Sequence, residues 1–295
     1  MRTAQGWTDY ELIDASGGNR LERWGSYILV RPDPQIVWDT PRDNPLWRRA
    51  DAVYVRASSG GGRWEYKKQL PQEWRIEWDG KLKLNVTPTG FKHTGVFPEQ
   101  AANWAVYEEL IRKAGRPISV LNLFGYTGAA TAACLRAGAG VCHVDASKGM
   151  VAAAKRNMEL NGLAGARVRY IVDDCAKFVA REVRRGVRYD AVIMDPPSYG
   201  RGPSGEMWRL EDNIYALIAL CRDVLSDRPL FFAVNSYTAG LSPSVTGYIV
   251  SSVLRGCAGS VHSDEIGIPV TESGLPLPCG GTALFVSNEV SLCKK

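Results

Sequence analysis

The sequence predicts an α/β fold: a doubly wound, mostly parallel sheet of seven strands, preceded by a smaller, mainly β domain. Two observations lead to this prediction. From about residue 118 onward, apolar strand-like runs alternate with helical patterns, which is typical of a parallel sheet with helices on both faces. Before residue 89 the segments are short, alternate with period two and contain seven of the nine tryptophans, which indicates a separate β domain.

The N-terminal part, residues 1–88, is expected to form a mainly antiparallel β domain. Turn residues, such as those at 58–62 and Pro71, break its alternating pattern into short strands. The clearest strand-like segments are 27–31, 52–56, 63–66 and 74–78.

The second part, residues 89–295, alternates strands and helices. A helix is expected from about residue 97 through 113, with Pro98 near its start. Strands are expected at 118–123, 140–145, 167–172, 188–195 and 228–235. Two tail segments joined by a Pro/Gly-rich loop, 261–268 and 282–287, would supply the last two strands.

A glycine turn follows the first strand of this second part. Residues 120–129 read Val-Leu-Asn-Leu-Phe-Gly-Tyr-Thr-Gly-Ala, an apolar run that turns through Gly125 and Gly128 into an expected helix beginning at Thr127. Such a turn lets a ligand approach the backbone and points unpaired N–H groups at an anion. About twenty residues later, Asp145 ends a second apolar strand, where a carboxylate can bind a ribose diol. Together they predict a site for a nucleoside-containing cofactor, although a glycine turn can also serve chain reversal alone.

A second motif ends a later strand. Residues 189–199 read Tyr-Asp-Ala-Val-Ile-Met-Asp-Pro-Pro-Ser-Tyr, which places an acid, two prolines and an aromatic ring at the strand's carboxyl end. Ligands of open α/β sheets bind at that edge. The acid and a proline carbonyl can accept hydrogen bonds from a planar amine, and the ring can stack on a base. The motif therefore favours recognition of a nucleobase or an amide.

These motifs resemble those of class I S-adenosylmethionine-dependent methyltransferases, and within them the bacterial 23S rRNA base methyltransferases. The resemblance covers about residues 85–290. Residues 122–128 are similar to the cofactor motif, Asp145 to the ribose acid, 173–174 to the adenine-side motif and 195–199 to the catalytic loop. The resemblance implies a Rossmann-like methyltransferase domain, S-adenosyl-L-methionine as cofactor and ribosomal RNA as partner.

The resemblance also implies roles for individual residues. The amides near Gly125 would hold the amino-acid end of the cofactor, and Asp145 would hold its ribose. The full implied cofactor set is Lys92, Thr94, Gln100, Asn122, Phe124, Gly125, Thr127, Gly128, Asp145, Ala146, Ser147, Asp174, Cys175 and Asp195, with His93 in the same loop as Lys92. The implied catalytic set is Asp195, Pro196, Pro197, Tyr199 and Asn235. Two alternatives stay open: Asp174 could be a helix cap, and Asn235 with Ser236 could simply end a strand.

Composition narrows the class of protein. No run of about eighteen apolar residues occurs and no apolar segment begins the chain, so neither a membrane protein nor an exported one is expected, and the cytoplasm is the default. Seven cysteines without a Cys-x-x-Cys pair and only three histidines argue against a disulfide framework or a metal site. We expect Cys134, Cys142 and Cys221 to be core residues.

Charge is compatible with an RNA partner but does not prove one. The formal charge is +5, and phosphate binding depends on where the cations lie. Arg201 and Arg209 flank the Pro-Pro loop and are the better candidates for RNA contacts. A second basic group also suggests RNA contacts, although a solvated helix end is the favoured interpretation: Arg181, Arg184, Arg185 and Arg188. Exposed aromatics in the N-terminal domain could stack RNA bases, although tryptophans of a small domain more often fill its core.

The absence of a cysteine at two positions indicates which type of methyl transfer to expect. Methylation of a pyrimidine at carbon 5 needs a nucleophile, normally a cysteine thiolate beside the base. Cytosine-modifying members of the family carry a cysteine after the fifth strand, where this chain has Val234-Asn-Ser-Tyr-Thr238, and none follows Pro196 and Pro197. This favours transfer to a ring nitrogen, or to an exocyclic amine or hydroxyl, which needs only alignment.

The expected function is methylation of a ribosomal RNA base at a nitrogen. A methyltransferase acting on a small molecule or a protein amide is the nearest alternative, because an Asp-Pro-Pro tip can also hold an amide. A catalytically silent RNA- or nucleoside-binding module is the non-enzyme alternative. A nicotinamide-dependent oxidoreductase would share the glycine turn and Asp145 but would not explain Asp195-Pro-Pro. The sequence leaves the acceptor and the oligomeric state open.

Overall fold

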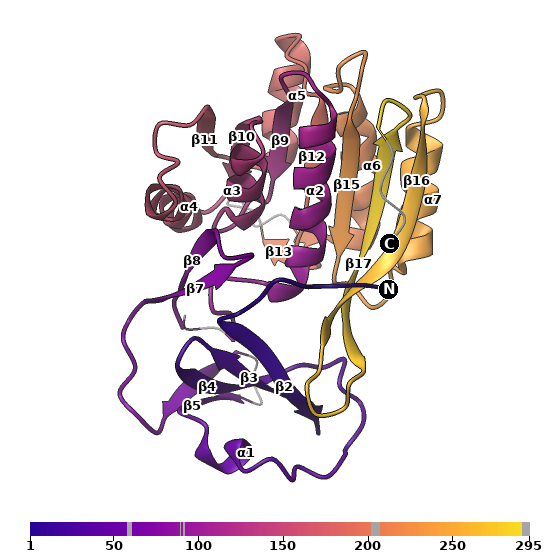
Figure 1. Cartoon of the computed structure of the whole chain (residues 1–295). Helices are drawn as coiled ribbons and strands as arrows, with labels where there is room; N and C mark the ends of the chain where they lie inside the picture. The colour runs from indigo at the N-terminus through magenta and orange to yellow at the C-terminus, as the bar shows by residue number, and fades with distance from the viewer. Residues whose placement is uncertain (58–60, 89, 91, 202–206, 291–295) are drawn as a thin grey trace. The chain divides into compact units, whose positions relative to one another are not determined.

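The computed structural model describes residues 1–57, 61–88, 90, 92–201 and 207–290 (Figure 1). The chain forms two compact units. Unit 1 comprises Met1–Ala102 with Ile266–Cys279, and unit 2 comprises Asn103–Glu265 with Gly280–Lys295. The expected boundary after residue 88 thus lies within unit 1, which also takes in a return of the chain from the C-terminal part. As a division between functional domains, that boundary stays a prediction.

Unit 1 is built on a five-stranded sheet. The strands are β2 (Tyr10–Ser16), β3 (Asn19–Trp24), β4 (Tyr27–Pro32), β5 (Ala52–Arg56) and β6 (Gly62–Tyr66), in that order. All neighbours are antiparallel except β4 and β5. The remaining elements are β1 (Arg2–Thr3), the short helix α1 (Leu46–Arg49), the hairpin of β7 (Trp74–Trp78) and β8 (Leu82–Val86), and the 3-10 turn η1 (Pro98–Gln100). β1 pairs in parallel with Ile266 and Gly267, which explains why that returning segment belongs to unit 1.

Most tryptophans of unit 1 are structural. Trp24 is completely buried, and the indole of Trp74 donates to its carbonyl at 3.0 Å. The indoles of Trp7, Trp38, Trp47 and Trp78 also donate to acceptors within the unit. The core-filling interpretation holds for Trp24 and Trp78, which are buried. Trp7, Trp47 and Trp74 are half-buried, and Trp38 is 39% exposed. Trp64 is also half-buried, and its ring stacks on that of the exposed Tyr66.

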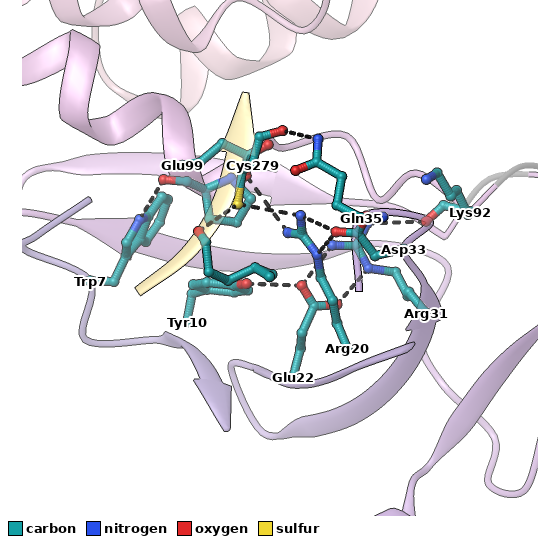
Figure 2. A network of polar contacts seen from close by, with 12 residues as sticks. Trp7, Tyr10, Arg20, Glu22, Arg31, Asp33, Gln35, Lys92, Glu99 and Cys279 are labelled. Atoms are coloured by element: carbon teal, nitrogen blue, oxygen red, sulfur yellow. Dashed lines mark hydrogen bonds and ion pairs between the residues drawn. The ribbon is translucent and has the colours of Figure 1, made fainter. Parts of the chain in front are cut away.

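Unit 1 also contains a network of buried charged side chains (Figure 2). Glu22 is fully buried and receives two bonds from Arg31, at 2.6 and 2.7 Å, and one from the Tyr10 hydroxyl at 2.9 Å. Burial alone would raise the pKa of Glu22, but Arg31 outweighs it and holds that pKa below its usual value. Arg20 donates to Asp33 at 2.6 Å and reaches Cys279 Sγ at 3.4 Å. The network therefore joins β3 to the returning segment of the chain.

Unit 2 contains the predicted parallel sheet. Its central strands run in the order β15-β12-β9-β10-β11, and every neighbouring pair among them is parallel. Their bounds are β9 (Ser119–Leu123), β10 (Gly140–Asp145), β11 (Val168–Val172), β12 (Ala191–Met194) and β15 (Phe231–Ser236). β17 (Pro276–Ser287) pairs antiparallel with β15, and β16 (Gly259–Pro269) follows it in the sheet. The seven predicted strands are present, and β1 makes an eighth next to β16.

Helices cover both faces of this sheet. They are α2 (Ala101–Lys113), α3 (Ala129–Arg136), α4 (Lys148–Leu160), α5 (Cys175–Arg184), α6 (Leu210–Arg222) and α7 (Pro243–Val253), with α2 on the near face and α6 on the far face in Figure 1. On one face, strand residues such as Leu121 and Val192 form a core with Phe178 of α5 and Ile214 of α6. On the other, the ring of Tyr107 in α2 stacks on Phe231 at 5.2 Å. The doubly wound α/β prediction is confirmed.

The sheet order places the candidate residues at one edge. β10 and β12 lie on opposite sides of β9, so the chain reverses its direction of winding there, and ligands bind at such a switch point. In register, Leu123 of β9 pairs with Met194 of β12 and with Val144 of β10. The residues that follow, Phe124, Asp195 and Asp145, therefore lie together at the carboxyl edge. Among the described residues, no helix is both long and apolar enough to span a membrane.

Candidate active site

The loop between β9 and α3 has an unusual backbone. Phe124 and Tyr126 have φ angles of 54° and 50°, and Gly128 has 85°. Positive φ is strained for residues with a side chain and costs about 1–3 kcal/mol at each position. Two such residues within three positions persist only where the surroundings hold them, which is common in ligand-binding loops.

Four hydrogen bonds from other elements hold this loop. Phe124 N donates to Cys175 Sγ at 3.4 Å, and Gly125 N to Val144 O at 3.0 Å. Tyr126 N donates to Asp145 Oδ2 at 2.9 Å, and the Thr127 carbonyl accepts from Asn157 Nδ2 at 2.8 Å. Each residue from 124 to 127 is thus fixed by an element outside the loop. Asn157, buried on α4, was not predicted from the sequence, because a single polar residue within a helical pattern gives no signal of this role.

Gly128 is the N-cap residue of α3 and has no side chain to cap the helix, so the first N–H groups of α3 are available to an anion. An added Cβ on Gly128 would lie 2.9 Å from Ala154 Cβ, and one on Gly125 would overlap the His143 ring. The glycines therefore let the backbone pack closely on the elements beneath it. Such a cradle fits the carboxylate end of an amino-acid ligand.

Asp145 links this loop to the next helix. Its Oδ1 accepts from Ser147 N at 2.8 Å, while Oδ2 accepts from Tyr126 N. A carboxylate has about four acceptor positions, so two remain for ribose hydroxyls. Ala146 and Ser147 are exposed beside it, and Ser147 also caps α4 through Met150 N at 3.4 Å.

The adenine-side residues prove to be structural as well. Asp174 caps α5 by accepting from Lys177 N at 2.8 Å, as the helix-cap alternative proposed. Asp173 forms an ion pair with Arg181. Cys175 is buried, and burial raises the pKa of its thiol to about 12, so it remains a thiol. A capping role does not prevent the backbone here from contacting adenine.

The tip of β12 carries the candidate acceptor residues. Asp195 is half-buried, Pro196 is buried and Pro197 is exposed. Tyr199 begins β13 (Tyr199–Arg201), which pairs antiparallel with β14 (Met207–Arg209). Its ring is 54% exposed, so it is accessible for stacking.

An aromatic residue that the sequence did not single out lies at this tip. The Trp208 indole donates to Pro197 O at 2.7 Å, and its ring centroid is 6.1 Å from that of Phe124. Trp208 thereby connects the Pro-Pro loop to the glycine loop. In the sequence, only the position of this aromatic residue shortly after the Asp-Pro-Pro motif could have indicated its role.

Asn235 is buried at the end of β15. Its Oδ1 accepts from Asn103 Nδ2 at 2.9 Å and from the Thr282 hydroxyl at 2.8 Å. This side of the amide therefore faces a polar cluster inside unit 2. Just beyond it, Thr238 Oγ1 donates to Ser198 Oγ at 2.7 Å, which joins the loop after β15 to the tip of β12.

Lys92, Thr94 and Gln100 belong to unit 1. Lys92 Nζ donates to Pro32 O at 3.4 Å, and burial, despite Asp33, lowers its pKa. Thr94 is buried, and its hydroxyl has no hydrogen-bond partner among the residues that the structure describes. Gln100 is buried at the end of η1. Burial, with Arg31 and Lys92, lowers the pKa of the neighbouring His93 to about 4.

Other predicted contacts have different surroundings. Arg209 is exposed and lies 3.7 Å from Asp212, whereas the side chain of Arg201 lies outside the described residues. In the second arginine group, Arg185 pairs with Glu182 at 3.1 Å.

Cys134, Cys142 and Cys221 are buried core residues, as predicted. Within the described ranges, no group of His, Cys, Asp or Glu is suited to hold a metal ion.

Comparisons with known proteins identify the family. Residues 64–218, more than half of the chain, match the family model of S-adenosylmethionine-dependent methyltransferases. The chain belongs to this family. The methyltransferase is also similar to a crystal structure of the SAM-dependent methyltransferase from Agrobacterium tumefaciens, with 36% identity and a TM-score of 0.90 over 96% of this chain and 92% of that one. It is therefore an enzyme that uses S-adenosylmethionine.

Two further similarities are more distant. The solved complex of SMU.776 with SAH has the same fold, with a TM-score of 0.76 at 20% identity over 96% of this chain and 76% of that one. The ribosomal RNA large subunit methyltransferase K/L of Shewanella frigidimarina is 33% identical over 138 residues. That match covers 46% of the methyltransferase described here but only 18% of the Shewanella protein.

Proposed function

We propose that the enzyme methylates a base of ribosomal RNA at a nitrogen. The name of the Shewanella relative supports an rRNA substrate. Because the chain spans only 18% of that relative, its substrate is carried over as a proposal. An rRNA substrate would also place the enzyme in the cytoplasm.

The tip of β12 is the observation that carries the proposal. It combines the exposed ring of Tyr199 with Asp195 and the rigid Pro196-Pro197 pair, which suits a flat base with a hydrogen-bonding edge. Among the described cysteines, none belongs to this tip or to the loop after β15. A ring nitrogen or amine needs no thiol, whereas carbon 5 of a pyrimidine does.

In this proposal the cofactor-binding residues and the acceptor-orienting residues have separate roles. Asp145 accepts from the ribose hydroxyls, and the amides of the Gly125 loop with Thr127 hold the amino-acid end. Bound S-adenosylmethionine supplies an electrophilic methyl group on sulfur. Asp195 and the Pro196 carbonyl orient the acceptor nitrogen, so that its lone pair points along the line of transfer. Alignment of this kind can supply most of the acceleration.

The resemblance assigns Lys92, Thr94 and Gln100 to the methionine end. The unpartnered hydroxyl of Thr94, buried among the described residues, fits a polar ligand. Ala146, Ser147, Asp174 and Cys175 would flank the adenosine by their backbone.

Transfer of labelled methyl from S-adenosylmethionine to ribosomal RNA of a strain lacking this gene tests the proposal. Nucleoside mass spectrometry of the product should show one methylated base with the methyl group on nitrogen. A carbon-methylated base would overturn the nitrogen assignment. Label on protein or on small molecules, with unlabelled rRNA, would favour the amide-acceptor alternative.

A further inference from the structure

A buried histidine lies directly beneath the glycine loop. His143 is on β10, two residues before Asp145, and its side chain is completely buried. An added Cβ on Gly125 would lie 2.4 Å from Cε1 and 2.5 Å from Nδ1 of the His143 ring. These separations are far shorter than van der Waals contact. The ring therefore occupies the space that any side chain at position 125 would need.

The His143 ring is fixed by neighbouring elements. Thr131 Oγ1, on α3, lies 2.9 Å from Nδ1, and Asn122 Nδ2, on β9, donates to the same hydroxyl at 2.9 Å. Because the hydroxyl accepts from Asn122, its proton is free to be donated to Nδ1, which leaves the imidazole proton on Nε2. Tyr170 of β11 packs edge-on at 5.9 Å.

Packing alone does not explain a histidine at this position. Nε2 of His143 has no hydrogen-bond partner within the described part of the chain, and an unpaired buried polar group costs about 1–3 kcal/mol. Burial also lowers the pKa of His143 to about 4, so the ring is neutral at physiological pH. An aliphatic side chain would fill the space without either cost. Unlike an aliphatic side chain, the planar ring is held in one orientation beneath Gly125 by the contact of Nδ1 with Thr131 Oγ1.

We propose that His143 is a positioning residue for S-adenosylmethionine. Its ring sets the position of the Gly125 backbone, and Asn122 and Thr131 act by fixing the ring. This inference rests on the assignment of loop 124–128 to the cofactor within the proposed function. It gives Asn122 an indirect role beneath the loop in place of the direct contact that the resemblance implies.

Compensating substitutions test the proposal. Gly125→Ala should weaken S-adenosylmethionine binding by about tenfold or more, since the new Cβ must displace either the ring or the loop. His143→Ala should weaken binding by about threefold to tenfold. In the double variant the cavity accommodates the Cβ, so affinity should recover at least about fivefold relative to Gly125→Ala alone. Calorimetry with the full chain measures each dissociation constant.

Gly128→Ala supplies a control in the same loop, where the φ of 85° adds backbone strain to the steric clash. Its Cβ would collide with Ala154, not with His143, so His143→Ala should not rescue Gly128→Ala. Thr131→Val, which removes the bond to Nδ1 without opening space, should weaken binding but rescue neither glycine variant. In turnover assays the losses should appear in KM for S-adenosylmethionine more than in kcat. Urea midpoints identify any variant that loses its fold.

The result that overturns the proposal is additivity. If the losses from Gly125→Ala and His143→Ala simply add, or if Gly125→Ala binds like the wild type, the ring does not position the loop. The readout is cofactor affinity, so failure to methylate RNA leaves this test intact. If Asp145→Ala and both glycine variants all bind normally, the cofactor-site assignment itself fails.

Discussion

Asp145 has a structural role before any ligand binds. Its two oxygens accept backbone N–H groups from Tyr126 and Ser147, which fixes both the glycine loop and the start of α4. The sequence predicted a ribose acid here, but the second role depends on a loop backbone that no local pattern reveals. In the proposed function, one carboxylate would serve cofactor binding both directly and by fixing the loop.

Asp145→Ala should weaken S-adenosylmethionine binding by about 1.5–3 kcal/mol, because hydrogen bonds to a charged acceptor are lost. Asp145→Asn is the matched variant. It retains one acceptor but places an amide N–H opposite a backbone N–H, so it should also bind weakly. Calorimetry measures the affinity, and circular dichroism checks the fold. Unchanged affinity in a folded Asp145→Ala protein would contradict the ribose assignment.

Cysteine substitutions test the nitrogen chemistry. Burial raises the pKa of Cys175 and of Cys279 to about 12, so neither supplies a thiolate. Replacing any single cysteine by serine or alanine should therefore leave methyl transfer largely intact, as measured by initial rates. A covalent protein–RNA adduct, or a rate loss above about a hundredfold in a folded variant, would show a nucleophilic cysteine.

At the scale of elements, hydrogen bonds join the tip of β12 to the β13–β14 hairpin and to the loop after β15. Trp208 donates to Pro197 O, and Ser198 is bonded to Thr238. These bonds join segments that follow different strands. The Asp-Pro-Pro motif was visible in the sequence because its residues are consecutive, whereas Trp208 and Thr238 come to it only through folding.

Substitutions at this tip should separate chemistry from cofactor binding. Asp195→Ala and Tyr199→Ala should lower methyl transfer by about tenfold to a thousandfold, since alignment and stacking contacts contribute roughly 1–3 kcal/mol each. If both residues address the acceptor and not the cofactor, S-adenosylmethionine affinity should change little in either variant. Paired calorimetry and RNA-methylation assays measure the two effects. Normal turnover by Tyr199→Ala with an inactive Asp195→Ala would move the assignment to a protein or metabolite acceptor.

At the scale of the molecule, hydrophobic periodicity was enough to predict the parallel sheet. β12 is a continuous apolar run and β9 is mostly apolar, because both faces of each strand are covered by helices. That order also placed Phe124, Asp145 and Asp195 at one edge. The short strand β1 was not predicted, since two residues carry no periodicity, and its pairing partner is Ile266. The extent of unit 1 depends on that pairing.

The contacts between buried polar residues also could not be predicted from the sequence. Glu22 and Arg31 are paired on adjacent strands, and Asn157 reaches the carbonyl of Thr127 from thirty positions away. A polar residue in such a pairing is recognised only once its partner's place is known. His143, which lies among the apolar residues of strand 140–145, likewise gave no sign in the sequence of its contact with Thr131.

This buried histidine gives the whole molecule a pH-dependent stability. The pKa of His143 is about 4 in the folded protein and about 6.5 when unfolded, so between these values the unfolded state binds more protons. Titration of His143 therefore has no effect on stability well above pH 6.5, and it lowers the free energy of unfolding progressively as the pH falls from 6.5 toward 4. From pH 7 to pH 5 the loss should be about 2 kcal/mol. Urea unfolding at the two pH values measures it, and His143→Asn, which does not titrate, should show a dependence smaller by that amount. If the wild type and His143→Asn lose the same stability between the two pH values, His143 is not held neutral in the folded protein. Its protonated ring would then have a partner that the neutral ring lacks.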